Sequence, residues 1–112
     1  MFDNTYKNKT VILTGHTGFK GSWLTMWLLK LGANVIGISK DIPTKPSMFK
    51  ILKIKKNIIH YSTDIRDFKK LQKIIFKHKP DFIFHLAAQS IVSKSYVDPV
   101  ETITTNVMGT MN

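Results

Sequence analysis

The sequence predicts an α/β chain, the first half of a doubly wound fold with a parallel sheet in strand order 3-2-1-4 and helices on both faces. Short apolar runs alternate with segments whose apolar residues repeat at helical spacing, which is typical of right-handed β-α-β crossovers. Three glycines, Gly15, Gly18 and Gly21, stand between the first apolar run and the first helical pattern. Residues 1–112 are therefore expected to form one nucleotide-binding unit.

Each of these glycines has its own reason to be there. The first permits a tight turn, the second lets the backbone approach a pyrophosphate, and the third lets helix and strand pack closely. The phosphates then sit at the helix N-terminus, where free N–H groups and the helix dipole favour negative charge. An ordinary glycine-rich loop is the alternative, and the strand before it and the helix after it argue against that.

The first strand and helix follow from apolar patterning. Residues 9–14 predict a strand buried on both faces, as parallel strands usually are. Residues 22–31 predict a helix with one apolar face, and Gly32 stands where a C-cap belongs. We expect the aromatic side chains of this helix in the core. The apolar residues of the helix are Leu24, Trp27, Leu28 and Leu31, widened by Trp23 and Met26.

Residues 34–39 predict the second strand, and its end carries the main departure from a dinucleotide-binding pattern. An acidic residue there usually binds the hydroxyls of the adenosine ribose. Here Ser39 and Lys40 occupy the expected position, and the acid follows at Asp41. Asp41 either reaches the ribose from the loop or is a plain turn residue. In the second case, discrimination between NAD and NADP falls to Ser39 and Lys40.

The rest of the chain continues the alternation. His85 lies in an apolar run, so it is interpreted as a hydrogen-bonded core histidine and not as a catalytic base. Asp64 or Asp67 can cap the helix after the third strand, and Asp98 with Pro99 opens the last helix. The remaining predicted elements are a proline-containing loop at 42–47, a short helix at 48–54, a strand at 57–63, an amphipathic helix at 68–78, a strand at 82–86, a polar loop at 89–97 and a final helix that runs to the end of the chain.

Composition excludes several classes of site. The chain has no cysteine, so disulfides and thiolate metal sites are impossible, and we expect no metal centre. No apolar run is long enough to cross a membrane, and the first residues do not resemble a secretory signal, so the expected compartment is the cytoplasm. The net charge of +10 comes from scattered lysines, and Arg66 is the single arginine. This pattern favours a solvated surface over a nucleic-acid site.

The residues also resemble a known family. The sequence of residues 14–24, Thr-Gly-His-Thr-Gly-Phe-Lys-Gly-Ser-Trp-Leu, is similar to the N-terminal segment of CDP-glucose 4,6-dehydratases. These enzymes are members of the extended short-chain dehydrogenase/reductase superfamily. Further matches are Asp-Ile-Pro-Thr-Lys-Pro-Ser at 41–47, Asp-Ile-Arg-Asp at 64–67, His-Leu-Ala-Ala-Gln at 85–89, Ser-Tyr-Val-Asp-Pro-Val-Glu-Thr at 95–102 and Thr-Asn-Val-Met-Gly-Thr at 105–110. The resemblance covers nearly the whole chain but about the first third of a family member.

The resemblance implies a lyase with a tightly held NAD and a Rossmann fold. In the family, NAD oxidises C4 of CDP-glucose, water is lost from C6, and the hydride returns to C6 to give CDP-4-dehydro-6-deoxyglucose for surface polysaccharide. The resemblance implies that the loop binding the pyrophosphate consists of Gly15, His16, Thr17, Gly18, Phe19, Lys20 and Gly21. Asp64 and Ile65 border the adenine, and Thr105 approaches the cofactor. Leu86, Ala87 and Ala88 line the nicotinamide-side ribose, with Gln89 also at the cofactor.

One position departs from the family, and the family's catalytic residues are not in this chain. Ser90 stands where proline is more frequent; related dehydratases have serine there beside the sugar, so Ser90 is assigned to the substrate. The catalytic Tyr-x-x-x-Lys pair is absent, because Tyr6, Tyr61 and Tyr96 have no lysine four residues later. The chain is therefore expected to be an N-terminal fragment, inactive alone, of an enzyme that forms a homodimer. The alternatives are a GDP-mannose or dTDP-glucose dehydratase, an epimerase, or a non-catalytic nucleotide-binding module.

Overall fold

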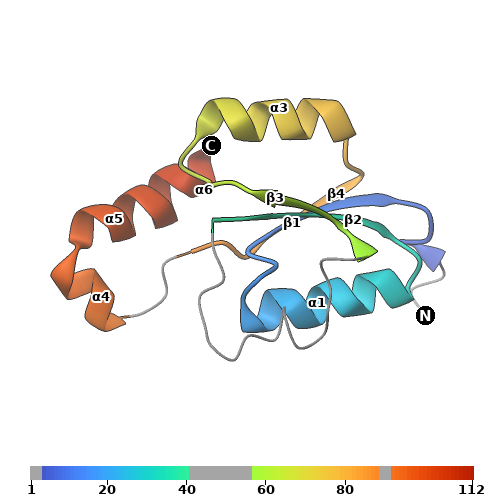
Figure 1. Cartoon of the computed structure of the whole chain (residues 1–112), viewed down its shortest axis with the longest axis horizontal. Helices are drawn as coiled ribbons and strands as arrows, with labels where there is room; N and C mark the ends of the chain where they lie inside the picture. Colours follow the sequence, from blue (N-terminus) through green and yellow to red (C-terminus); the bar gives the residue numbers. More distant parts are fainter. Residues whose placement is uncertain (1–3, 41–56, 89–91) are drawn as a thin grey trace.

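The described residues form a four-stranded parallel sheet with helices on both faces (Figure 1). The computed structural model describes residues 4–40, 57–88 and 92–112. The strand order is β3-β2-β1-β4, so the predicted fold class and order 3-2-1-4 are confirmed. The elements are β1 Thr10–Thr14, α1 Phe19–Lys30, β2 Asn34–Ser39, β3 Ile59–Ser62, α3 Phe68–His78, β4 Phe82–His85, α4 Val92–Val97, α5 Pro99–Ile103, the π-helical turn η3 Thr104–Met108, and α6 Gly109–Met111.

Alternate residues of the two central strands bury into two separate cores. Val11 and Val35 pack with Leu28 on the side of α1. Ile12, Ile36 and Ile38 form the core on the other side. They pack with Ile65 and with Leu71 and Ile74 of α3. This period of two is what a strand covered on both faces requires, because successive side chains point to opposite faces. β1 is accordingly buried from Val11 to Thr14, whereas β4 is half-buried with alternating exposure.

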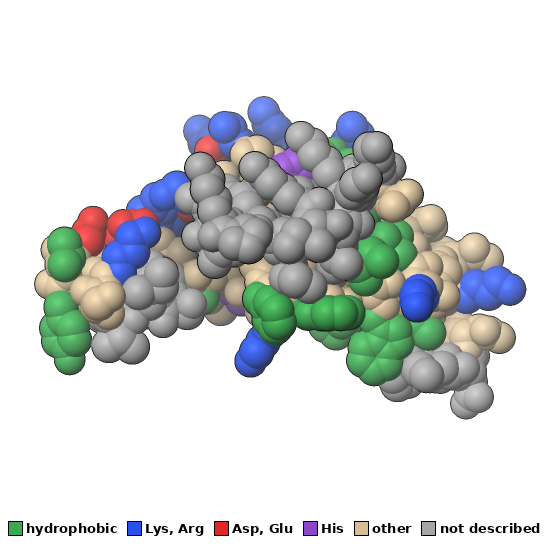
Figure 2. Space-filling view, turned by 60° about the horizontal axis from the view of Figure 1, so that its bottom comes forward, with side chains coloured by type: hydrophobic (Ala, Val, Ile, Leu, Met, Phe, Trp, Pro, Cys, Tyr) green, Lys and Arg blue, Asp and Glu red, His purple; other side chains and the backbone are tan. Residues whose placement is uncertain are grey.

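The helix α1 turns a different side to the sheet from the one its apolar pattern predicts. Its buried residues are Gly21, Ser22, Thr25 and Leu28. Trp23 and Trp27 are 53% and 48% exposed, so the expectation that they lie in the core is wrong. Figure 2 shows apolar side chains on the outer surface in this part of the molecule. The reason is local: α1 begins at Phe19, not at residue 22, so its first turn is part of the glycine loop, and close contacts there fix how the helix is rotated.

Two other expectations need correction. Residues 92–97 form the helix α4 and not a loop. His85 is exposed on β4, so it is not a core histidine, although its ring is hydrogen-bonded. The predicted helix caps are confirmed. Asp67 accepts a hydrogen bond from the Lys70 N–H, and Asp98, which precedes Pro99, accepts one from the Glu101 N–H. The predicted helix at 48–54 lies outside the described residues. In the described part of the chain, no helix has the length and apolarity needed to span a membrane.

Candidate functional site

The glycine loop joins the end of β1 to the start of α1 and is held by backbone contacts. Gly15 has a φ of 78°, and a Cβ there would lie 2.8 Å from the backbone of Leu86 and Ala87. A Cβ on Gly21 would overlap the carbonyl oxygen of Gly15. A Cβ on Gly18 would meet the same oxygen at 3.5 Å, an ordinary contact. The fold therefore needs Gly15 and Gly21 as glycine, whereas at Gly18 it leaves space outside the loop for a ligand.

The polar side chains of the loop point into the protein. Thr17 Oγ1 lies 2.6 Å from Ser39 Oγ at the end of β2, and both side chains are buried. The Ser22 hydroxyl donates to the His16 carbonyl at 3.0 Å. Phe19 and Lys20, by contrast, are exposed in the first turn of α1. Thr17 and Ser39 thus fix the loop to the sheet, and the backbone N–H groups at the start of α1 suit an anion.

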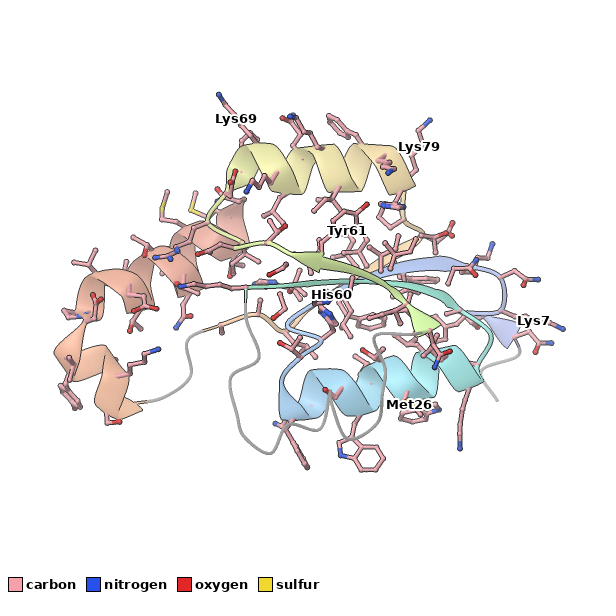
Figure 3. All side chains as sticks on the ribbon, viewed as in Figure 1. Lys7, Met26, His60, Tyr61, Lys69 and Lys79 are labelled. Atoms are coloured by element: carbon pink, nitrogen blue, oxygen red, sulfur yellow. The ribbon has the colours of Figure 1, made fainter. Side chains whose placement is uncertain are left out.

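A pair of histidines, His16 buried and His60 partly buried, connects the loop to β3. His16 is fully buried, and its Nε2 lies 2.6 Å from His60 Nδ1 on β3. Figure 3 shows His60 on the α1 side of the sheet and its neighbour Tyr61 on the α3 side. A Cβ on Gly37 would overlap the His16 ring, so β2 makes room for the imidazole with a glycine. Burial, followed by the charge of His60, lowers the pKa of His16 to about 4. The contact with His60 gave no signal in the sequence, because the two residues lie far apart in the chain.

Thr14 connects the loop to the end of β4. Its hydroxyl oxygen accepts bonds from the N–H groups of Leu86 and Ala87 at 3.1 and 3.2 Å, and it lies 2.6 Å from His85 Nδ1. His85 Nε2 in turn lies 2.9 Å from Thr110 Oγ1, whose proton goes to the Asn106 carbonyl. In a neutral imidazole these roles place the proton on Nε2, and Nδ1 then accepts from Thr14. This chain of bonds holds the segment after β4 against the glycine loop.

Replacing Thr14 by valine tests this connection. The change keeps the shape of the side chain but leaves His85 Nδ1 and the Ala87 N–H without this partner. We expect the free energy of unfolding to fall by about 1–2 kcal/mol, the cost of unmade hydrogen bonds at a partly buried site. Urea unfolding followed by circular dichroism measures it, with Thr14→Ser as the control that keeps the hydroxyl. Equal midpoints for the valine variant and the wild type would contradict the arrangement.

The remaining predicted site residues that the structure describes lie at the same edge of the sheet. Ile65 is buried and Asp64 is partly exposed in the turn after β3; Leu86 is 44% exposed, Ala87 is partly buried and Ala88 is exposed after β4. Thr105 is partly buried in η3. Parallel sheets bind ligands at this carboxyl edge. Asp41, Gln89 and Ser90 lie outside the described residues. Among the described residues, no cluster of three or more His, Asp or Glu side chains could hold a metal ion.

The sequence reasoning missed a groove at this edge. It has a volume of about 660 Å³ and lies where β2 ends, beside the turn after β3 and against α5 and η3. Arg66 Nη2 donates to Asp64 Oδ2 at 2.7 Å, and this bond holds the pKa of the Asp64 carboxyl below its usual range. The lining residues are Lys40, Arg66, Phe68, Asp98, Val100, Glu101, Thr104, Met108 and Asn112.

Comparison with known proteins agrees with this geometry. The family model for GDP-mannose 4,6 dehydratase matches residues 12–112. The chain is 50% identical over 97% of its length to CDP-glucose 4,6-dehydratase of Salmonella typhimurium, and 32% identical over 92% to GDP-mannose 4,6-dehydratase of Vibrio cholerae. It spans 30% and 29% of these two relatives.

Solved structures share the same arrangement of elements. UDP-glucose 4-epimerase of Thermotoga maritima, solved with UDP-glucose, superposes with a TM-score of 0.81 at 29% identity, over 91% of this chain and 31% of that one. The Thermus thermophilus UDP-glucose 4-epimerase complex with NAD gives 0.79 at 27% identity, again over 91% and 31%. Because the family model spans nearly all of its residues, the chain belongs to the GDP-mannose 4,6-dehydratase family.

Proposed function

We propose that this chain is the NAD-binding part of a sugar-nucleotide 4,6-dehydratase that converts CDP-glucose to CDP-4-dehydro-6-deoxyglucose. The observation that supports this substrate over GDP-mannose is the 50% identity to the Salmonella CDP-glucose enzyme, against 32% to the Vibrio GDP-mannose enzyme. The space at Gly18 supports the cofactor assignment. NAD is also named for the Thermus epimerase complex, a structure of the same arrangement.

In this proposal the glycine loop binds the pyrophosphate through its backbone. The loop residues are Gly15, His16, Thr17, Gly18, Phe19, Lys20 and Gly21. The polar side chains of His16 and Thr17 bond inward, so their role is to hold the loop in shape. Gly18 leaves room for the phosphates, and the first turn of α1 presents N–H groups to them. A loop already fixed to β2 and β3 loses little conformational entropy when the anion binds.

The two ends of the dinucleotide would lie along the carboxyl edge of the sheet. Asp64 and Ile65 border the adenine, and Thr105 approaches the cofactor from η3. Leu86, Ala87 and Ala88 follow β4, and the bonds from Thr14 fix their backbone beside the nicotinamide-side ribose. Asp41 at the adenosine ribose, Gln89 at the cofactor and Ser90 at the sugar complete the set; these three lie outside the described residues.

Bound NAD would supply the hydride acceptor and donor for a reaction that begins by oxidising the sugar. The described residues of this chain would contribute binding and orientation. Proton transfer and most contacts with the sugar would come from the two thirds of such an enzyme that this chain does not match. We propose accordingly that residues 1–112 are a cofactor-binding half-domain, inactive towards CDP-glucose alone, and that the whole enzyme is a cytoplasmic homodimer.

Calorimetric titration of the chain with NAD tests the cofactor assignment. We expect saturable binding by the wild type. Gly18→Val should weaken it by about 100-fold, because a branched side chain would block the approach of the pyrophosphate to the backbone. The circular dichroism spectrum of the variant should match the wild type, since a Cβ at position 18 meets no tight contact. Undiminished NAD binding by the variant would rule the loop out as the phosphate site.

A chimaera tests the enzymatic assignment. This chain would replace the matching first 30% of the Salmonella enzyme, and the 4-keto product would be measured with CDP-glucose. We expect turnover by the chimaera, none by the chain alone, and none by the chimaera with Gly18→Val. A folded chimaera that binds NAD but turns over no CDP-glucose would contradict the proposal. If the chimaera instead epimerised UDP-glucose, the result would favour the hypothesis that the parent protein is an epimerase. The similarity to the Thermotoga structure suggests this alternative.

A further inference from the structure

Acidic residues gather at one place in a basic chain. The net charge is +10 with seven Asp and Glu residues, and three of these, Asp64, Asp98 and Glu101, lie in or against the groove at the carboxyl ends of β2 and β3. Figure 2 shows acidic and basic side chains side by side at the end of the molecule that carries α4 and α5. Counting the described residues, the groove is therefore close to neutral, although the chain as a whole is strongly positive.

The two cations among the described lining residues, Lys40 and Arg66, are both paired with carboxylates. Arg66 donates from Nε and from Nη2 to Asp64, at 3.0 and 2.7 Å to the same oxygen. Lys40 Nζ lies 3.9 Å from Asp64 Oδ2 and 3.9 Å from Glu101 Oε1. The carboxylate side chains of Asp64 and Glu101 are 25% exposed, so solvent screens these pairs less than it would on an open surface.

Glu101 is brought to the groove by the packing of the last helix. Asp98 accepts the Glu101 N–H at 3.0 Å and fixes the first turn of α5. At the other end, the Asn112 amide donates to the carbonyl of Ile65 at 3.1 Å, and Gly109 packs directly on the Ile65 side chain. Position 101 thus faces the end of β2 because the helix is anchored on the turn after β3.

The end of β2 is where a dinucleotide-binding fold holds the adenosine ribose. NAD has a 2′-hydroxyl there, which can donate to a carboxylate. NADP has a 2′-phosphate with a charge near −2, which needs cations and is repelled by carboxylates. Of the described residues at this strand end, Ser39 is buried and bonded to Thr17, so Lys40 is the described side chain there that can select between the two.

We propose that Glu101 is a specificity-determining residue, which selects a 2′-hydroxyl over a 2′-phosphate by pairing with Lys40 and adding negative charge to the groove. The proposal rests on the NAD-binding function above. It assigns cofactor choice to a residue of the last helix and not to the second strand itself. Lys40 taken alone would favour a phosphate. Its pairing with Glu101 opposes this preference.

The test compares the dissociation constants of NAD and NADP, measured by calorimetry on the full chain. In Glu101→Gln we expect the ratio of the NADP constant to the NAD constant to fall by about five- to tenfold, because one charge near the phosphate is removed in a partly screened site. The matched control is Asp81→Asn, which makes the same change in net charge at the opposite edge of the sheet, where Asp81 accepts the Thr10 N–H. It should leave the ratio unchanged.

Each outcome decides between the two proposals. A ratio in Glu101→Gln equal to that of the wild type, with NAD still bound, overturns the role of Glu101 and leaves the NAD-binding function standing. Equal weakening of both cofactors also overturns it, because a merely structural residue would act on both alike. Equal falls in the ratio for both variants show an effect of net charge and overturn it too. A wild type that binds neither cofactor overturns the NAD-binding function, and this proposal with it.

Discussion

Alanine at position 21 is expected to lower the free energy of unfolding by about 3 kcal/mol or more, the upper end of the range for forcing atoms into a packed site. The added Cβ would overlap the carbonyl oxygen of Gly15 and lie 2.9 Å from the Cα of His16. Both neighbours are backbone, and the Gly15 N–H is bonded to the Ile38 carbonyl at 2.8 Å. Neither the loop nor the helix can move aside without breaking its attachment to the sheet.

The matched control is alanine at position 18, three residues earlier in the same loop. Its Cβ meets the Gly15 oxygen at 3.5 Å, and its φ of −76° suits any residue. We expect a loss within about 1 kcal/mol, the usual difference between glycine and alanine at a helix N-cap. Urea unfolding of the three proteins measures both changes. Similar midpoints for the two variants would show that the contact at Gly21 does not limit how α1 packs.

Acidification is expected to destabilise the chain between pH 7 and pH 5 through His16. Its pKa is about 4 in the folded protein and 6.5 when unperturbed, so in this window the unfolded state binds more protons. The stability contributed by neutral His16 is complete above pH 6.5 and is lost as pH falls towards 4. The loss between pH 7 and pH 5 is about 2 kcal/mol by linkage. Carboxylates stay largely ionised in this range, so they add little to the slope.

Unfolding in urea at several pH values, for the wild type and for His16→Gln, measures this contribution. We expect the variant to be less stable at pH 7, because it disturbs the pair with His60, but to lose less stability between pH 7 and pH 5. The contribution of His16 is the difference between the two proteins in the slope of the free energy of unfolding against pH. Parallel slopes would show that burial of His16 does not control the pH dependence.

Local sequence signals predicted most of the fold because the strands and helices here are defined by short-range patterns. The apolar runs of β1 and β2 fill two cores with alternate residues, and their sequence shows it. The rotation of α1 could not be predicted in this way. Its apolar stripe includes Trp27, yet the contact between Gly21 and Gly15 decides which side faces the sheet. Close backbone packing outweighed the burial of an indole ring.

The candidate site was predictable where it is made of backbone, and not where it is made of paired side chains. Glycine spacing indicates a loop that approaches phosphates, because the requirement is steric and local. The pairs His16 with His60, and Lys40 with Glu101, join residues far apart in the chain. A single sequence contains no record of such proximity. All the assignments of residues to the cofactor or the sugar remain predictions, and those at Asp41, Gln89 and Ser90 also lie outside the described part.

The π-helical turn η3 makes the number of residues in the last helix as important as their identity. In a turn of this kind residues five apart lie on one side of the helix. Thr104 and Gly109 have this separation, and they meet Arg66 and Ile65, two neighbours in the turn after β3. Deleting one residue between them would restore ordinary winding, in which residues four apart share a side, so Gly109 would stay against Ile65. Ordinary winding without that deletion would instead rotate Gly109 by about 100° and place a larger side chain against Ile65. The π-helical turn thus accommodates one residue more than ordinary winding, and a further one-residue insertion within 104–108 would shift the register of the residues that follow.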